Sequence, residues 1–443
     1  MKILKIVAIN LVVLAILAVV VEAGSWGVLK AYYRFFFSRP SGIASDHFEV
    51  ERQDIFTTPE LRRAYTEWNQ SPFRYMPFAM YMHKPLQSGV MDIREDGSRS
   101  NGTESDARKC GYTIWMFGSS SLVAPEVLDD ETLAARLEAK LNEGASGSSP
   151  SICVKNFGQV GYVVQQDLAL FNNLLGLNTA PNMIVTFDGW NDMNISWAYK
   201  PVEERYDSWF EPVFDQWFVN GPAVIQRVKE WFPNTIALIQ KASDFIGLHM
   251  ADPAQFKAAY LERQRRFNRE LDEEKYPERQ RVVFETLKSI VGVAKIRGID
   301  VVLTQIPVMM AADKTWVGFE KSYWNARALN SFARPEAEIE AWTGIDRFAF
   351  QQYERDWQMI DPALFRRWYR ENNQKLKRLA DGTGSGYVDM TAVLDAPRYR
   401  DEVLYLSQAH MSKRGLDILA TALAREVRGR MASSSHRPAT ATP

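Results

Sequence analysis

Five short apolar runs, spaced between residues 112 and 390, are the main structural signal in the sequence. They cover residues 112–117, 152–156, 183–187, 301–306 and 387–390. Continuous apolar runs of this length, without polar alternation, are typical of parallel strands that are buried on both faces. We therefore expect five strands of one parallel sheet.

Helical periodicity separates these runs. Leu133, Leu137 and Leu141 form one apolar stripe after a polar start at residues 129–132. A second stripe ends at Gly298, and Asp361-Pro362 has the form of a helix start. The last stripe is Leu416, Leu419, Leu423 and Val427. Strands that alternate with helices predict a doubly wound, flavodoxin-like α/β fold, for which we predict the strand order 2-1-3-4-5.

The N-terminus has a different pattern, because residues 6–21 are apolar except for Asn10 and follow a positively charged start. After Glu22 the weakly apolar stretch extends to Leu29, which reaches the length of a membrane span. Small residues around Ala23 would also suit a signal-peptidase site. We favour an uncleaved signal-anchor within residues 1–30, which makes the protein a single-pass membrane protein. Flanking charge does not settle the orientation.

The remaining segments complete the predicted organisation. Residues 31–109 are expected to be a linker and flanking segment, and residues 110–431 the α/β domain. Residues 193–278 and 308–360 are aromatic-bearing insertions that start near strand ends, either as a structural lobe or as a lid. The composition of residues 432–443 predicts a disordered tail.

The two cysteines, Cys110 and Cys153, form no CxxC pair, so we expect no metal cluster. A disulfide between them is one possibility. However, counted back from the strand ends they lie about four residues out of register, so two separate buried thiols are the favoured interpretation.

Composition narrows the function only slightly. Hydrophobic residues make up 46% and charged residues 24% of the chain, which is normal for a globular protein. The net charge of −1, together with the lack of nucleic-acid motifs, argues against a nucleic-acid partner.

Four motifs fall beyond the carboxyl ends of four of the predicted strands, where ligands bind in such sheets. They are Gly118-Ser119-Ser120-Ser121, the segment 156–161, the segment 188–192, and His410. In that order they resemble the serine, glycine, asparagine and histidine blocks of the SGNH (GDSL-type) hydrolases, in a membrane-anchored bacterial-type variant with a Gly-Gly-Ser-Thr-like first block. The resemblance covers about residues 110–192 and 385–428.

This resemblance implies a role for each motif. Ser120 would be the nucleophile and His410 the general base. The backbone N–H groups of Ser120 and Gly161 and the side-chain amide of Asn191 would form the oxyanion hole. Gly161 is preferred over Gly158 because the family's glycine lies five residues after the asparagine. No metal or other cofactor is implied.

The chain departs from the family three residues before the histidine. The family has Asp-x-x-His, whereas this chain has Ser407 at the aspartate position. That aspartate normally orients the imidazole and stabilises its protonated form. Ser407, Asp389, Asp401 and Glu402 are the candidates to replace it. A Ser–His dyad oriented by a backbone carbonyl, or an inactive protein, are the other interpretations.

We therefore predict a serine esterase that acts on an ester, such as an acylated carbohydrate, with an extracytoplasmic (periplasmic) catalytic domain by analogy with anchored relatives. The alternatives are an O-acyltransferase of cell-surface polysaccharide and a non-catalytic binding protein of the same family. The sequence names neither the acyl group nor the acceptor.

Overall fold

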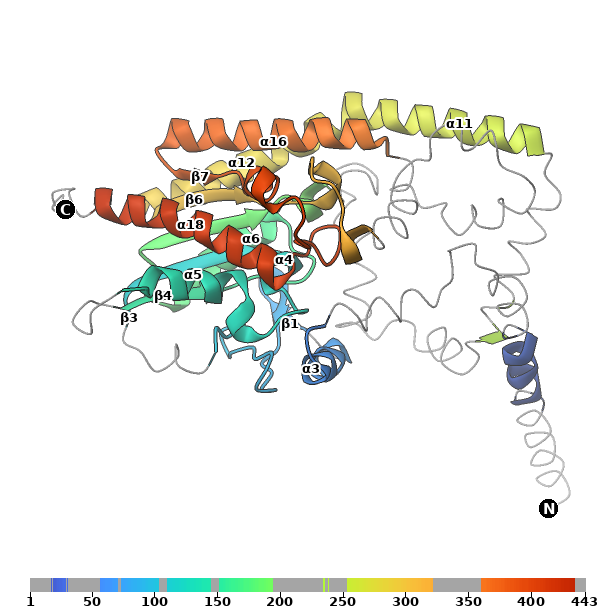
Figure 1. Ribbon diagram of the computed structural model, residues 1–443, viewed down its shortest axis with the longest axis horizontal. Helices are drawn as coiled ribbons and strands as arrows, with labels where there is room; N and C mark the ends of the chain where they lie inside the picture. Colours follow the sequence, from blue (N-terminus) through green and yellow to red (C-terminus); the bar gives the residue numbers. More distant parts are fainter. Residues whose placement is uncertain are drawn as a thin grey trace, which may run out of the picture.

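The five apolar runs form one parallel sheet in the computed structural model (Figure 1). The model describes residues 17, 19–28, 30, 56–70, 73–102, 110–144, 151–193, 234–235, 238, 253–321 and 360–434. The strands are β3 (Cys110–Gly118), β4 (Ser151–Asn156), β5 (Met183–Asp188), β6 (Asp300–Gln305) and β7 (Gly386–Val388). Their order is β4-β3-β5-β6-β7, which confirms the predicted order 2-1-3-4-5.

Helices cover both faces of the sheet. On one face α5 (Leu133–Asn142) packs against α18 (Lys413–Ser434), with α17 (Met390–Leu394) beside α18. On the other face α6 (Val164–Leu177) packs against α12 (Tyr276–Ile296), which also contacts α16 (Pro362–Thr383). The helix α11 (Pro253–Glu270) leads into α12 through a π-helical turn, Leu271–Lys275, and extends beyond the sheet (Figure 1).

The strands divide their side chains between two hydrophobic cores. In β3, Ile114 and Met116 belong to the core under α5 and α18, whereas Trp115 and Phe117 belong to the core under α6 and α12. This alternation is the two-residue period of a strand with both faces buried. It explains why the run is apolar throughout.

The predicted helix starts and the predicted apolar face of the last helix are present in the structure. The hydroxyl of Thr132 accepts a hydrogen bond from the Ala135 N–H at the start of α5. Asp361 caps α16 with Pro362 as its first residue. The four predicted apolar positions of α18 are all fully buried: Leu416, Leu419, Leu423 and Val427. The helix continues to Ser434, so the predicted tail begins later than residue 432.

The segment before the sheet is more than the linker that we predicted for residues 31–109. It contains α3 (Pro59–Gln70) and a hairpin of β1 (Phe73–Met76) and β2 (Met80–His83). Side chains from Phe56 to Met91 contribute to the core under α6. Short strands and polar turns gave this segment little periodicity, which is why the sequence did not reveal its packing.

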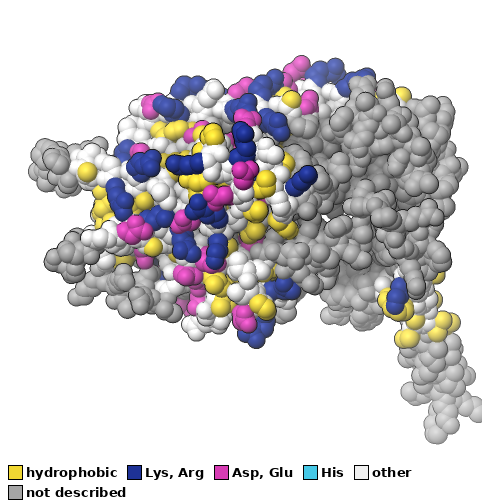
Figure 2. Space-filling view, in the orientation of Figure 1, with side chains coloured by type: hydrophobic (Ala, Val, Ile, Leu, Met, Phe, Trp, Pro, Cys, Tyr) yellow, Lys and Arg dark blue, Asp and Glu magenta, His cyan; other side chains and the backbone are white. Residues whose placement is uncertain are grey.

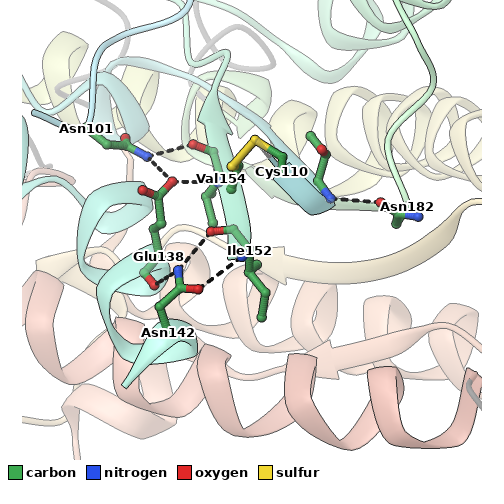
Figure 3. Close-up of a disulfide and its surroundings, with 9 residues drawn as sticks. Asn101, Cys110, Glu138, Asn142, Ile152, Val154 and Asn182 are labelled. Carbon is green, nitrogen blue, oxygen red and sulfur yellow. Dashed lines mark hydrogen bonds between the residues drawn. A yellow bond between two sulfur atoms is a disulfide. The ribbon is translucent and has the colours of Figure 1, made fainter. Parts of the chain in front are cut away.

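The favoured interpretation of two separate thiols is wrong, because Cys110 and Cys153 form a disulfide (Figure 3). Thr113 is the residue directly opposite Cys153, as counting back from the strand ends suggests. A register shift between Cys110 and Tyr112 then brings Cys110 opposite Ser151. The Cα atoms of the two cysteines consequently lie 5.6 Å apart, a normal separation for a bridge. Gly111 lies at this shift, and a glycine inside a strand often marks such an irregularity, but counting from the strand ends assumed an unbroken register.

The structure describes only parts of the two chain ends and of the two predicted insertions. Among the described residues, no helix is both long and apolar enough to cross a membrane. Residues 1–16, which hold the first part of the predicted span, lie outside them. So do most of the two predicted insertions and the tail after residue 434. On the face in Figure 2, acidic and basic side chains are interspersed.

Candidate active site

Ser120 is the first residue of a one-turn helix, α4 (Ser120–Val123), directly after β3. The strand must approach its neighbour closely at this point. A Cβ atom on Gly118 would lie 2.3 Å from the backbone oxygen of Phe187 in β5, so only glycine fits there. This glycine lets the chain turn sharply and present Ser120 at the carboxyl end of the sheet.

His410 lies in a closed loop between β7 and α18. A bridge between Tyr405 and Met411 closes the loop, and the His410 carbonyl accepts the N–H groups of Leu406 and Ser407. After the loop, Ser412 caps α18 through its hydroxyl and the Gly415 N–H. The imidazole is thus carried by a loop with internal hydrogen bonds, and its side chain is 19% exposed.

The structure brings Ser120 and His410 together. Ser120 Oγ lies 3.0 Å from His410 Nε2, which is hydrogen-bond distance. The other ring nitrogen, Nδ1, lies 2.5 Å from Oε1 of Glu126. Nucleophile, base and carboxylate therefore form one continuous chain with the geometry of a catalytic triad.

None of the four residues that we proposed as partners of His410 occupies this position. Ser407 contacts the histidine through its backbone N–H. Asp389 caps α17, and Glu402 forms a salt bridge with Arg414. Asp401 is exposed. The carboxylate comes instead from Glu126, in the turn that follows α4.

A buried arginine holds the turn that carries Glu126. Arg99 is fully buried and donates hydrogen bonds to the carbonyls of Val123, Ala124 and Val127. Its Nε also forms a 2.9 Å ion pair with Asp129. Because these carbonyls flank Glu126 on both sides, Arg99 fixes the backbone that presents the carboxylate. The only sequence signal for Glu126 was its closeness to Ser120, six residues before it.

Glu126 changes the acid–base behaviour of the histidine. Burial lowers the pKa of His410, but the negative charge of Glu126 and its hydrogen bond outweigh burial, so the net pKa is raised above its ordinary value. The carboxylate accepts from Nδ1–H, which leaves the Nε2 lone pair facing Ser120. This is the tautomer that a general base requires.

The predicted oxyanion donors lie on the loops after β3, β4 and β5. Gly161 has a φ of +78°, in the left-handed region. Within the described residues, the backbone N–H groups of Ser120 and Gly161 make no hydrogen bond. The side-chain amide of Asn191 donates one bond, of 2.9 Å, to the Tyr162 carbonyl. This bond ties Asn191 to the residue after Gly161, and among the described residues the amide donates no other hydrogen bond.

A second group of carboxylates lies beneath these loops. Asp167, Asp188 and Asp192 are almost completely buried. Burial raises the pKa of each, that of Asp188 to about 7. Of the three, Asp192 has a cationic partner among the described residues, Arg279, at 3.5 Å. In the part of the chain that the structure describes, no group of His, Cys, Asp and Glu residues has an arrangement that would hold a metal ion.

Comparison with known proteins finds similarity at the level of solved structures. No family model matches the chain, and no curated protein matches it. Similar structures include a lipolytic protein of the G-D-S-L family from Veillonella parvula, with 13% identity and a TM-score of 0.33 over 72% of this chain and 100% of that one. A catalytic mutant of an acetylxylan esterase from Geobacillus stearothermophilus has 14% identity and a TM-score of 0.34, over 72% of this chain and 94% of that one.

A third similar structure is an alpha/beta hydrolase enzyme from the metagenome of Lake Arreo, Spain. It has 12% identity and a TM-score of 0.33, over 72% of this chain and 96% of that one. The first of these similar proteins carries the name of the family that the motifs resemble. At these identities and TM-scores, no conclusion about the activity of this chain follows from the similarity.

Proposed function

We propose that this protein is a serine ester hydrolase in which Ser120, His410 and Glu126 form the catalytic triad. The observation that carries the proposal is the continuous chain from Ser120 Oγ to His410 Nε2, at 3.0 Å, and from His410 Nδ1 to Glu126, at 2.5 Å. A serine, a neutral imidazole and a carboxylate in this order are the parts that nucleophilic acyl transfer needs. A carboxylate at Nδ1 also removes the main support for a non-catalytic protein.

The first half of the reaction acylates Ser120. Its Oγ attacks the ester carbonyl carbon while His410 Nε2 takes the hydroxyl proton. The carbonyl oxygen becomes an oxyanion, which the N–H groups of Ser120 and Gly161 and the amide of Asn191 bind. The C–O bond to the alcohol then breaks, and His410 gives its proton to the departing oxygen.

The second half releases the acid. Water attacks the acyl carbonyl and passes a proton to His410, and collapse of the tetrahedral intermediate frees Ser120, which takes that proton back. The negative charge of the Glu126 carboxylate stabilises the imidazolium in both halves.

Labelling and hydrolysis test this proposal together. Wild-type protein is expected to react with a fluorophosphonate probe and to hydrolyse 4-nitrophenyl acetate, and both activities should vanish in Ser120→Ala. His410→Ala should lose hydrolysis by about 10³-fold or more. Ser121→Ala, a buried serine next to the nucleophile, is the matched control and should retain activity. Unchanged hydrolysis in Ser120→Ala would rule out the mechanism.

For the substrate we propose an acyl ester on a carbohydrate, with transfer to a sugar hydroxyl as the alternative. Both follow from the family that the sequence motifs resemble, and both use the same acyl-enzyme. Release of acetate from an acetylated oligosaccharide, measured with and without an unacetylated acceptor, separates them. A product acetylated on the acceptor would identify a transferase.

We also propose that residues 6–28 anchor the protein in a membrane with the catalytic domain outside the cytoplasm. The disulfide between Cys110 and Cys153 supports an oxidising compartment. Membrane fractionation of the full-length chain should recover it with the membranes. A soluble form whose mature N-terminus is Gly24 would instead identify a cleaved signal peptide.

A further inference from the structure

Strand β2 forms hydrogen bonds with Val160, the residue directly before Gly161, whose N–H is one of the proposed oxyanion donors. The hydroxyl of Tyr81, in β2, donates a 2.7 Å hydrogen bond to the carbonyl of Val160. Two residues along the same strand, His83 Nε2 accepts the Val160 N–H at 3.3 Å. Both polar groups of Val160 are therefore held by side chains of one strand.

The bond from Tyr81 has a direct consequence for Gly161. A peptide unit is planar and trans, so the Val160 carbonyl and the Gly161 N–H point in opposite directions and rotate together. A hydroxyl that fixes the carbonyl on one side fixes the direction of the N–H on the other. Hydrogen bonds in such a chain also polarise one another, so a bond at the carbonyl makes the N–H a better donor.

The packing around Gly161 supports the same arrangement. A Cβ atom at this position would lie 2.9 Å from the Tyr81 hydroxyl, and the residue has a φ of +78°. Glycine thus allows both the left-handed conformation and the close approach of the tyrosine. A larger residue at position 161 would therefore displace the Tyr81 hydroxyl.

The protonation states also suit these roles. Tyr81 is 3% exposed, and burial raises the pKa of its hydroxyl well above the usual value, so it remains a donor. Burial, together with the nearby charge of Arg99, lowers the pKa of His83 to about 3. The imidazole is consequently neutral near pH 7, and its Nε2 can accept the Val160 N–H.

We propose that Tyr81 is a positioning residue that orients the Gly161 N–H toward the oxyanion. This inference rests on the proposed esterase function. It adds the N-terminal hairpin to the catalytic apparatus, although the hairpin supplies no reacting group.

Kinetics of a conservative variant test the catalytic half of the inference. Tyr81→Phe removes only the hydroxyl and should lower kcat by about tenfold, less than the 10²–10³-fold typical for loss of a whole oxyanion donor. KM should change little, because the oxyanion exists only in the transition state. Tyr276→Phe is the control, since this buried hydroxyl donates to the Trp368 carbonyl in another part of the molecule.

An NMR measurement tests the hydrogen bond without relying on activity. Protein labelled with 13C-carbonyl valine and 15N-glycine gives signals only from Val–Gly pairs, of which the sequence has three, at 160–161, 291–292 and 317–318. Tyr81→Phe should shift the Val160 carbonyl and Gly161 amide signals and leave the other two pairs in place. Tyr276→Phe should leave the Val160–Gly161 pair in place.

The two measurements separate this inference from the proposed function. An unshifted Val160–Gly161 signal, or a kcat equal to that of Tyr276→Phe in an active enzyme, would overturn the role of Tyr81 alone. Wild-type protein that neither reacts with the fluorophosphonate nor hydrolyses the ester would overturn the esterase proposal, and the catalytic half of this inference with it.

Discussion

Two sets of buried carboxylates lie near the carboxyl ends of the strands, and they are partnered in opposite ways. Glu126 lies 2.5 Å from an imidazole that can carry positive charge. Asp167 and Asp188 interact with each other, and within the described residues no other group donates a hydrogen bond to either carboxyl group. The third aspartate, Asp192, has Arg279 at 3.5 Å and also accepts the Val164 N–H.

The difference shows that the partner of a buried carboxyl group determines whether the pKa of the partner or that of the carboxyl group itself is raised. At Glu126, the charge and the hydrogen bond raise the pKa of His410, so the carboxylate supports a proton on its neighbour. In the aspartate group, burial is the main cause that raises the pKa values, and the negative charge of Asp192 adds to it at Asp167 and Asp188. Glu126 therefore stabilises the protonated form of His410, whereas burial of Asp167 and Asp188 stabilises their own protonated forms.

The largest effect is expected for Glu126→Gln, which keeps the shape of the side chain and removes its charge. Replacing the acid of a Ser-His-Asp triad by its amide lowers turnover by about 10⁴-fold. We expect a fall in kcat of about 10²- to 10⁴-fold here, measured with 4-nitrophenyl acetate. Asp188→Asn, the same change in the other group, should reduce kcat far less. Equal losses in both variants would contradict the distinction between the two sites.

The pH dependence of Glu126→Gln sharpens the comparison. In the wild type, kcat/KM should rise with pH through the raised pKa of His410, because the base must be neutral to accept the Ser120 proton. Removing the carboxylate removes the two causes that raise this pKa. The midpoint of the acidic limb should therefore move to lower pH while the plateau falls. A midpoint that stays in place would show that Glu126 does not act on His410.

A smaller effect concerns stability and should appear at the aspartate group. Asp188 has a pKa of about 7 in the folded protein, and an unfolded aspartate has its ordinary value of about 4. Between these values the folded state holds more protons, so the free energy of unfolding should fall as the pH rises. Asp188→Asn should reduce this fall, by about 1–3 kcal/mol at pH 8.

Urea unfolding at pH 5 and pH 8 measures this difference. Asp381→Asn is the control, because Asp381 forms an exposed pair with Lys377. A wild-type stability that does not change between the two pH values would contradict the raised pKa of Asp188 in the folded protein.

The smallest effect is expected for Ser407→Asp, which restores the aspartate of the family pattern. Nδ1 of His410 already donates to Glu126, so a second carboxylate has no bond to gain at that nitrogen. We expect kcat/KM to stay the same or to fall slightly. An increase would indicate that Glu126 is not the orienting group in solution.

Much of the framework could be predicted from the sequence because it depends on local periodicity. Continuous apolar runs gave the five strands, and the leucine stripe of α18 gave its buried face. The position of Ser120 at the end of β3 followed from the same pattern, and so did that of His410 in the segment beyond the end of β7. The two residues are 290 positions apart, yet parallel strands bring their carboxyl ends to one edge of the sheet.

The partners of these residues could not be predicted in the same way. Glu126 and His410 are 284 positions apart, and their contact depends on the paths of the two loops that carry them. The hydrogen bonds of Arg99 fix the path of the loop that carries Glu126. Tyr81 reaches Val160 from a hairpin with little periodicity, and the disulfide depends on one register shift. The sequence by itself determined the strands, the helix faces and the edge of the sheet where the chemistry lies, because backbone geometry repeats every two or 3.6 residues. Only the tertiary structure decided which carboxylate orients His410 and which side chain orients Gly161, because loop paths are set by packing rather than by a repeating pattern.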